Sequence, residues 1–496
     1  MENEVWELVP ISEVPEGMNI TKVRWVLRIK YNPDDTVDKY KARICAKGFT
    51  QMYGIDYNET FAPVIRMTIL RMLLAIAIAN DWDVLHVDVK TAFLNAFLKE
   101  EVYCEQPEGF EVYGPNGEKL VCRMKKAIYG LKQAPRNWNE ELTAFIKSQG
   151  FRQSKVDHCL FIRYSETHIT IILVYVDDLQ ITGSSRKLCE EFIKDLGNKY
   201  NITNKGDLQY YNGLEIVRDK KNKRGKLHQE KYIRDILKEF KMEKATGKDT
   251  PLGVNDDLTV DEIGDYEDIS LYRSIVGKLL WLSVCTRPDI TTAVSRLSRA
   301  LQKPSKKHWI GAKRLLRYLK NTKTHGLTYG GGDLVLHGWS DSDWAGTANP
   351  GRRSTSGWIF LLNGAAVSWS SKPQQTAALS STEAEYIAAC SATQETMYLR
   401  AVLRDLGFAQ GEATPLHADN TGCIQIANNP VFHARTKHIE LKYHYIREKI
   451  ETGDTVLVYE NTEHNIADFL TKILPRLPHE KFTSWSGVTA MKMTPS

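Results

Sequence analysis

Hydrophobic and polar positions along the chain predict a succession of short strands and helices. Residues 20–50 read as two strands around an Asn-Pro-Asp-Asp turn, with basic residues interleaved along both strands. Residues 67–80 are mostly apolar, which predicts a buried helix. Other strands are predicted at 83–89, 159–164, 169–176, 179–183, 334–341, 354–363, 365–371 and 415–419. One further helix is predicted to begin at about residue 91. Others are predicted at 135–149, 187–200, 229–241, 270–301, 306–320, 381–406 and 465–473.

Two stretches rich in turn residues divide this succession into domains. Residues 244–268 are charged and rich in turn formers, and three consecutive glycines occupy 330–332. The predicted domains are therefore 1–245, 246–330 and 331–496. Beyond 331 three strands, a long helix, another strand and further helices indicate a mixed α/β domain. We expect a multidomain protein of the α/β and α+β classes.

Composition adds three limits to this picture. The 496 residues include 42% hydrophobic and 26% charged residues, as in ordinary globular proteins. No apolar stretch reaches the roughly 20 residues that a membrane-spanning helix needs, and the N-terminus lacks the order of a signal peptide. Eight cysteines without a C-x-x-C pair indicate reduced, intracellular thiols rather than a zinc or redox motif.

Charge is concentrated in one predicted helix. The net charge of +5 is too small to indicate a class of partner, but residues 303–323 hold eight Lys and Arg residues and no acid. Two interpretations remain open for them, a solvated helix face and a contact with a nucleic-acid backbone.

Two adjacent aspartates interrupt the strand-forming sequence "LVYVDDLQI" (173–181). Taken alone, Asp177 and Asp178 are typical of a hairpin turn. Asp88, however, ends another apolar strand, and carboxylates on neighbouring strand ends can hold two divalent ions for phosphoryl transfer. Such chemistry also needs cations for a triphosphate, which Lys41 and Arg43 in "KYKARICAKG" can supply. Together these residues suit a template-directed polymerase.

A second set of acids lies in the last predicted domain. Its members come from four separate elements and converge where a strand ends, as in a two-metal hydrolase acting on nucleic acid: Asp341, Glu385, Asp419 and Asp468. Glu383 is explained differently, because Ser380 and Glu383 fit a helix capping box.

Long composite motifs carry a resemblance to a known family. "YKARICAKGFTQMYGIDYNETFAPV", "HVDVKTAFLNAFLKEEVY", "KAIYGLKQAPRNW" and "LVYVDDLQITG" resemble the reverse transcriptase of copia-type LTR retrotransposons. The resemblance implies a right-hand polymerase with fingers, palm and thumb in 1–245, and connection helices in 246–330. It implies that Asp88, Asp177 and Asp178 are the catalytic, metal-binding carboxylates of the palm. Gln180 and Asn212 are more polar than the family pattern at their positions.

The same resemblance implies a set of substrate-binding residues. Lys41 and Arg43 would contact the incoming triphosphate, although Arg43 has a surface sheet charge as its alternative. Phe93 would crowd a ribose 2′-hydroxyl and favour deoxynucleotides, or else be an ordinary core residue. Tyr129 and Gly130 would lie beneath the nascent base pair, with core packing as the alternative for Tyr129.

The C-terminal motifs resemble a ribonuclease H domain that follows this family's polymerase. They include "SDSDWAGT", "SSTEAEYIA", "HADNTGCIQIANNP" and "IADFLTK". The resemblance implies that Asp341, Glu385, Asp419 and Asp468 are its catalytic and metal-binding acids. Roles for three nearby residues stay open: Asp343, His438 and His464. His464 has a surface position as its main alternative.

The implied function is RNA- and DNA-directed DNA synthesis with removal of RNA from the hybrid. It implies two Mg²⁺ ions per active site, with Mn²⁺ as a substitute. Expected partners are an RNA template, a DNA primer and template, the RNA–DNA hybrid and deoxynucleoside triphosphates, with no membrane. A dimer and association with integrase are also compatible, as is a location in cytoplasmic virus-like particles or the nucleus.

Other interpretations of the whole chain remain. The motifs cover neither the protease nor the integrase of such polyproteins, so we expect a processed product or a fragmentary gene copy. A decayed or domesticated copy that binds nucleic acid without catalysis is the alternative function. A transposase-type site is a third reading of the C-terminal acids, but their order Asp, Glu, Asp, Asp favours ribonuclease H.

Overall fold

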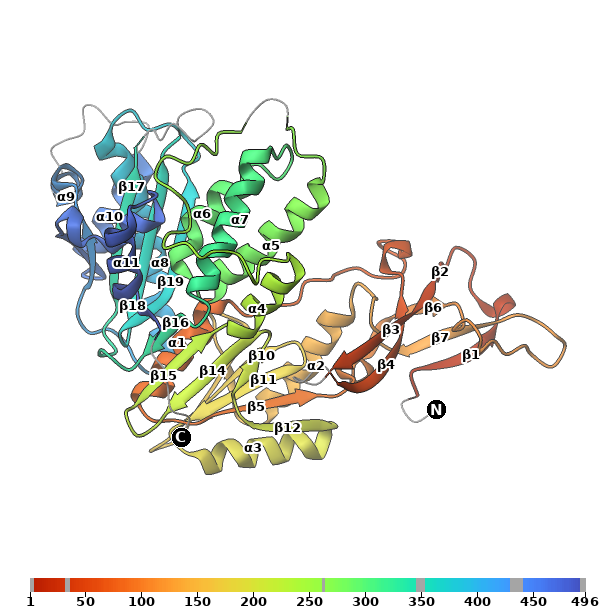
Figure 1. Ribbon diagram of the computed structural model, residues 1–496. Coiled ribbons are helices and arrows are strands. Elements are labelled where there is room, and N and C mark those ends of the chain that lie inside the picture. Colours follow the sequence, from red (N-terminus) through yellow and green to blue (C-terminus); the bar gives the residue numbers. More distant parts are fainter. Residues whose placement is uncertain (1–3, 32–35, 261–263, 345–352, 429–439, 491–496) are drawn as a thin grey trace. The chain divides into compact units, whose positions relative to one another are not determined.

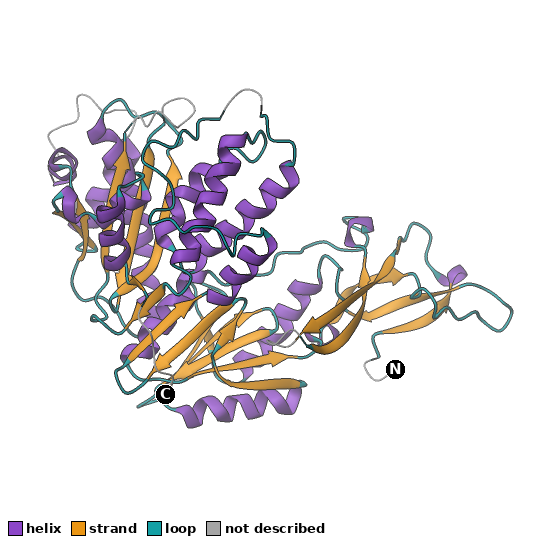
Figure 2. Ribbon diagram, in the orientation of Figure 1, coloured by secondary structure: helices purple, strands orange, loops and turns teal. Residues whose placement is uncertain are grey.

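The computed structural model describes residues 4–31, 36–260, 264–344, 353–428 and 440–490. The chain forms two compact units: unit 1 comprises 1–65 and 84–207, and unit 2 comprises 66–83 and 208–496. Helices and strands are mixed in both units (Figure 2), which confirms the α/β multidomain class. No helix in the described residues is both long enough and apolar enough to span a membrane. The domain boundaries near 245 and 330 stay predictions.

The central sheet of unit 1 carries the first set of acids. Its antiparallel strands run in the order β12 (Ile202–Asp207), β5 (Val84–Val89), β11 (Asp178–Gly183), β10 (Ile169–Tyr175), β9 (Leu160–Tyr164) and β8 (Arg152–Gln153). The middle residues of β10 are buried on both faces of the sheet. Its sequence suits this position, because these residues are all β-branched or leucine. Helix α3 (Arg186–Lys199) contacts β11 and β12 and runs along the sheet (Figure 1). This packing fixes the strands that present the acids.

The rest of unit 1 is built from a second sheet, a two-stranded ribbon and helix α2 (Ala134–Ser148). The second sheet has the order β1 (Trp6–Pro10), β7 (Leu120–Lys126), β6 (Phe97–Cys104) and β2 (Ile20–Thr21). The ribbon pairs β3 (Val23–Tyr31) with β4 (Val37–Ala46), as predicted for residues 20–50. Its register places Lys41 opposite Arg28, and Arg43 two residues further along the same face.

Helices dominate the first part of unit 2 (Figure 1). They are α1 (Met67–Ala79), α4 (Glu230–Glu239), α5 (Ile269–Cys285), α6 (Thr291–Ser298) and α7 (Lys306–Asn321). The predicted helix at 270–301 is divided between α5 and α6, because Pro288 lacks a backbone N–H and disfavours a helical residue before it. Helix α1 is buried as predicted, since ten of its residues, Ile69 to Ile78, are shielded from solvent.

The basic residues of α7 have an unexpected structural role. Lys320 Nζ donates to the carbonyl of Ala245 at 2.6 Å, and Lys307 Nζ lies 3.1 Å from Asp257 Oδ2. Arg314 donates to the hydroxyl of Thr250 at 3.0 Å. These cations hold the segment 245–257 against the helix, so part of the predicted solvated or phosphate-binding face is used within the fold.

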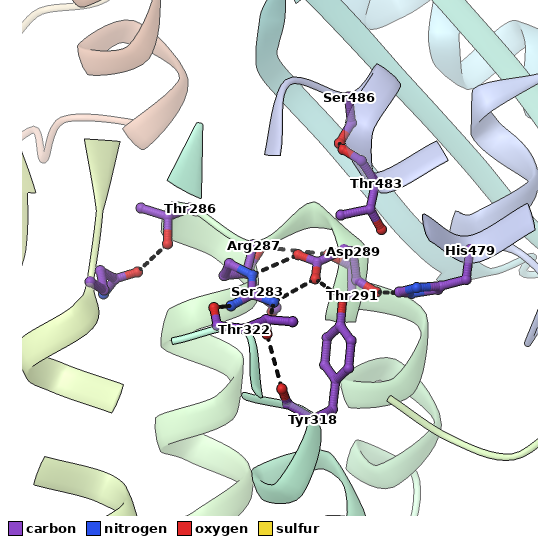
Figure 3. A network of polar contacts seen from close by, with 11 residues as sticks. Ser283, Thr286, Arg287, Asp289, Thr291, Tyr318, Thr322, His479, Thr483 and Ser486 are labelled. Carbon is purple, nitrogen blue, oxygen red and sulfur yellow. Dashed lines mark hydrogen bonds and ion pairs between the residues drawn. The ribbon is translucent and has the colours of Figure 1, made fainter. Parts of the chain in front are cut away.

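Two buried arginines join distant parts of unit 2. Arg71 of α1 donates to the carbonyls of Val367 and Val284 at 2.7 Å, and its guanidinium lies 4.0 Å from the ring centroid of Trp369. Burial lowers the pKa of Arg71 to about 10. Arg287 faces Asp289 in a second network, shown in Figure 3.

Partners from two other helices complete this second network. Tyr318 of α7 donates to Asp289 Oδ2 at 2.7 Å. His479 of α11 (Arg476–Trp485) approaches the carbonyl of Asp289 at 3.1 Å. The network therefore fixes the C-terminal helix against the helical core of unit 2 (Figure 3).

Two sheets complete unit 2. One has the order β13 (Tyr210–Tyr211), β14 (Leu214–Asp219), β15 (Arg224–His228), β16 (Gly326–Tyr329) and β22 (Val488–Thr489). Asn212 and Gly213 form the turn between β13 and β14 with φ of +47° and +80°, so the polar Asn212 serves the turn rather than packing. The other has the order β19 (Ala365–Pro373), β18 (Thr355–Leu362), β17 (His337–Asp343), β20 (Thr414–Ala418) and β21 (Thr455–Tyr459).

The helices beside this last sheet are α8 (Ser381–Asp405), α9 (Thr421–Asn428) and α10 (Glu440–Glu451). The predicted helix at 465–473 is wrong in type, because 466–470 form a 3₁₀ helix. Its hydrogen bonds span three residues, as from Thr471 N to Asp468 O, and Asn465 caps its start. The α-helix α11 follows it and lies outside the prediction.

Candidate active sites

The first set of acids meets across two paired strands of unit 1. Asp88 on β5 lies directly opposite Asp178, the first residue of β11. Asp177 lies in the two-residue turn that joins β10 to β11, so the predicted hairpin is present. The other turn residue, Val176, has a φ of +57°, which is unfavourable for a β-branched side chain.

Two hydrogen bonds hold this strained turn. Trp138 Nε1 on α2 donates to the carbonyl of Val176 at 2.7 Å, and the N–H of Val89 donates to the carbonyl of Asp177 at 2.8 Å. The Trp138 side chain is buried, so the first contact is shielded from water. The surroundings thus fix a backbone conformation that the local sequence disfavours.

Asp178 has two basic neighbours. Its Oδ1 atom lies 2.6 Å from His86 Nε2 and 3.1 Å from Lys205 Nζ. Burial alone would raise the pKa of Asp178, but the contacts with His86 and Lys205 outweigh burial and lower it. The pKa of Asp177 is raised, because burial and the charges of Asp178 and Asp88 all oppose its ionisation.

Two aromatic residues and an arginine lie beside these acids. The rings of Phe93 and Tyr129 are 4.6 Å apart, edge to face, and the Arg43 guanidinium lies 5.1 Å from the Tyr129 ring centroid. The pKa of Tyr129 is raised by burial and by the charges of Asp177 and Asp88. The structure therefore brings three of the predicted substrate-binding residues together beside the acids.

Gly130 and Lys41 complete the predicted set. Gly130 has a φ of +93°, and a Cβ atom there would lie 2.0 Å from the carbonyl oxygen of Ala46. The N–H of Ala46 also donates to the carbonyl of Tyr129 at 2.8 Å, so the two segments touch along their backbones. Only glycine fits this approach. Lys41 is half-buried on β4.

The second set of acids meets in unit 2. One ligand atom from each of Asp341, Asp419 and Asp468 lies within 4.8 Å of the others. Asp341 is on β17, Asp419 follows the parallel neighbour β20, and Asp468 is on the 3₁₀ helix. Carboxylate oxygens are the ligands that Mg²⁺ prefers, so this group fits a divalent ion.

Glu385 joins the second set from near the start of α8, just after the first turn. Its Oε1 atom accepts from the N–H of Ser342 at 3.2 Å. Burial, followed by the charges of Asp341 and Asp419, raises the pKa of Glu385 well above its usual value. The helix start is fixed by Ser380, whose hydroxyl accepts from the N–H of Glu383 at 3.1 Å as the capping box predicts.

Lys472 supplies the second set with a counter-charge. Its Nζ atom lies 2.9 Å from Asp468 Oδ1 and 3.5 Å from Asp341 Oδ1. Burial and the charge of Asp341 nevertheless raise the pKa of Asp468 to about 7. The hydroxyl of Thr471 donates to Asp341, and that of Thr462 donates to Asp419 at 2.7 Å.

Three further residues near the second set had open roles. Asp343 ends β17, and burial raises its pKa although Arg296 opposes the shift. His464 is about half exposed, 3.7 Å from Glu460 and beside the ring of Trp485. His438 lies outside the described residues.

Sequence reasoning missed three basic residues in these sites: His86, Lys205 and Lys472. His86 precedes Asp88 by two residues on one strand, so strand periodicity places both side chains on the same face. Lys472 follows Asp468 by four residues, which is helical spacing. Gln180 lies opposite His86 and is fully buried, and among the described residues its amide has no hydrogen-bond partner.

Known proteins match this chain over different shares of its length. A family model described as reverse transcriptase (RNA-dependent DNA polymerase) matches residues 3–254. A ribonuclease H1 solved in complex with an RNA/DNA hybrid, LC11-RNase H1, is 19% identical and covers 28% of this chain and 96% of its own. Its TM-score of 0.22 does not establish a shared fold.

Longer matches come from plant retrotransposons. The retrovirus-related Pol polyprotein from transposon TNT 1-94 of Nicotiana tabacum is 41% identical over 96% of this chain and 36% of its own length. The corresponding polyprotein from transposon RE2 of Arabidopsis thaliana is 39% identical over 100% of this chain and 33% of its own. The chain thus spans about a third of the length of these copia-type relatives. It belongs to the reverse transcriptase (RNA-dependent DNA polymerase) family.

Proposed function

We propose that the chain is a DNA polymerase that copies RNA, and then DNA, and that also cleaves the RNA strand of the resulting hybrid. The family assignment supports the polymerase activity. The observation that carries the proposal is the register of β5 and β11, which sets Asp88 opposite Asp178 with Asp177 in the adjoining turn. Phe93, Tyr129 and Arg43 line one side of these acids, where a nucleotide would lie.

In the proposed polymerase reaction, the 3′-hydroxyl oxygen of the primer attacks the α-phosphorus of a deoxynucleoside triphosphate. A new P–O bond forms, the bond to the β-phosphate oxygen breaks, and pyrophosphate leaves. Asp88, Asp177 and Asp178 would hold two Mg²⁺ ions, which supply charge neutralisation and hydroxyl activation when bound. Arg43 would neutralise triphosphate oxygens, and Phe93 would exclude a 2′-hydroxyl.

In the proposed nuclease reaction, a water oxygen attacks a phosphodiester of the RNA strand, and the 3′-oxygen leaves. The carboxylates of Asp341, Glu385, Asp419 and Asp468 would hold divalent ions at the scissile phosphate. The meeting of three of these acids within 4.8 Å supports the site. Thr471 and Thr462 orient two of them through their hydroxyl donors.

Two assays on the full chain test the proposal. Primer extension on an RNA template with Mg²⁺ should be lost in Asp178→Asn and kept in Asp195→Asn, which removes an exposed acid of α3. Hybrid cleavage should be lost in Glu385→Gln and kept in Glu412→Gln, another exposed acid. A folded wild type silent in both assays would instead support the copy that binds nucleic acid without catalysis.

A further inference from the structure

Strand β12 is irregular beside the first set of acids. Its antiparallel pairing with β5 shifts register between Asn204 and Asp207. Gly206, within this stretch, has a φ of +73°, and its N–H donates to Asn204 Oδ1 at 2.9 Å. Such bulges redirect side chains near functional sites. Here the redirected side chain is that of Lys205.

The Lys205 ammonium is shared by two of the predicted metal ligands. Nζ lies 3.1 Å from Asp178 Oδ1 and 3.4 Å from Asp88 Oδ1. The Lys205 side chain is 39% exposed, whereas that of Asp178 is 18% exposed. The ammonium therefore reaches the carboxylates from the solvent side and can leave them without disturbing the core.

His86 contacts the same carboxylate oxygen from within the protein. Because its Nε2 atom is 2.6 Å from Asp178 Oδ1, this oxygen has two nitrogen neighbours. His86 and Lys205 thus both contact a carboxylate oxygen of Asp178 that a divalent ion would also need as a ligand.

The two sets of acids differ in the distances between their carboxylate oxygens. Lys472 also contacts two acids of the second set, yet Asp341, Asp419 and Asp468 still present ligand atoms within 4.8 Å of one another. Within the described residues, the acids of the first set do not form such a group.

We propose that Lys205 sets the divalent-ion affinity of the first site, because its ammonium is the counter-ion of Asp88 and Asp178 and competes with the metal for them. This inference rests on the proposed polymerase function. Binding of the ion requires Lys205 to give up both ion pairs, so the site needs a higher metal concentration than it would with an uncharged residue at 205.

Direct Mn²⁺ titration tests the inference without an activity assay. The loss of the free Mn²⁺ signal in electron paramagnetic resonance is followed in the full chain carrying Asp419→Asn, which weakens the second site. In this background Lys205→Met should bind Mn²⁺ roughly threefold to thirtyfold more tightly, as expected for removal of one nearby, partly exposed charge. The Mn²⁺ affinity of Lys205→Arg should stay near that of the reference chain. So should that of Lys187→Met, which removes an 85% exposed lysine of α3.

A second measurement guards against a folding defect. Without a metal, Lys205→Met leaves Asp88 and Asp178 without their shared cation, so its melting temperature in EDTA should fall and its rise on adding Mn²⁺ should exceed that of the reference. Lys205→Gln serves as a second uncharged variant should Lys205→Met fail to fold.

Each other outcome counts against the inference. Equal Mn²⁺ affinity in the reference and in the uncharged variants overturns it. Weaker binding in those variants also overturns it, and would make Lys205 a support of the carboxylates. A reference chain whose Mn²⁺ binding is unaffected by Asp178→Asn, or that binds none, would overturn the proposed polymerase site as well.

Discussion

Arg287 and Asp289 form an ion pair that is closed to solvent. Arg287 Nε and Nη2 donate to the two carboxylate oxygens of Asp289 at 2.8 and 2.7 Å, and both side chains are 0% exposed. Removing one partner of such a pair leaves an uncompensated buried charge. We therefore expect Asp289→Asn to lower the free energy of unfolding by about 3–5 kcal/mol, measured by urea denaturation.

The control for this prediction is an exposed ion pair of the same unit. Asp249 lies 3.1 Å from Arg476, with both side chains more than half exposed. Asp249→Asn should cost less than about 1 kcal/mol. Equal losses in the two variants would contradict the special role of the buried pair.

Gly130→Ala should abolish primer extension and leave hybrid cleavage in place. The new Cβ atom would lie 2.0 Å from the carbonyl oxygen of Ala46, so the backbone beside Tyr129 must move. Gly17→Ala is the matched control, because Gly17 also has a positive φ, +87°, but no atom within 4 Å of the added Cβ. Equal extension by the two variants would show that the close approach at Gly130 is unimportant.

Phe93→Val should raise the incorporation of ribonucleotides relative to deoxynucleotides by about tenfold or more, since a smaller side chain admits the 2′-hydroxyl. Single-nucleotide extension kinetics measure this ratio. Phe151→Val is the control, because Phe151 belongs to the same buried cluster. Loss of stability in both variants with an unchanged ratio would make Phe93 an ordinary core residue.

His325 should make the stability of unit 2 depend on pH. Burial, with the nearby Arg287, lowers the pKa of His325 from 6.5 to about 4. Between these values the unfolded chain binds a proton that the folded chain does not, so stability falls as the pH drops from about 6.5 to about 4. As the pH is lowered across this window, the urea midpoint should fall less in His325→Asn than in the wild type. An equal fall in the two proteins would show that His325 does not cause the pH dependence.

Local pattern was sufficient to place the acids on their elements, apart from Asp468, which lies on a 3₁₀ helix instead of the predicted helix. Asp88 and Asp178 were identified because each is a charged residue beside an apolar strand. Glu385 was identified because the capping box gives Glu383 a structural role but gives Glu385 none. Strand periodicity could also have indicated His86. These inferences need only the neighbours of each residue along the chain.

Contacts over long sequence separations were not predictable in this way. Lys205 reaches Asp88 because of a register shift in β12, and no local pattern specifies where a bulge falls. Arg71 reads as a charge on a buried helix, whereas its carbonyl partners lie more than two hundred residues away. The basic face of α7 is partly used to hold the segment 245–257, which depends on tertiary packing.

The most direct test of the two-site account is whether its two activities can be lost separately in one chain. Asp178→Asn should lose primer extension on an RNA template and keep hybrid cleavage, while Glu385→Gln should keep extension and lose cleavage. Both activities are measured with Mg²⁺ on the same preparation of each full-length variant. Extension that survives Asp178→Asn, or cleavage that survives Glu385→Gln, would contradict the account.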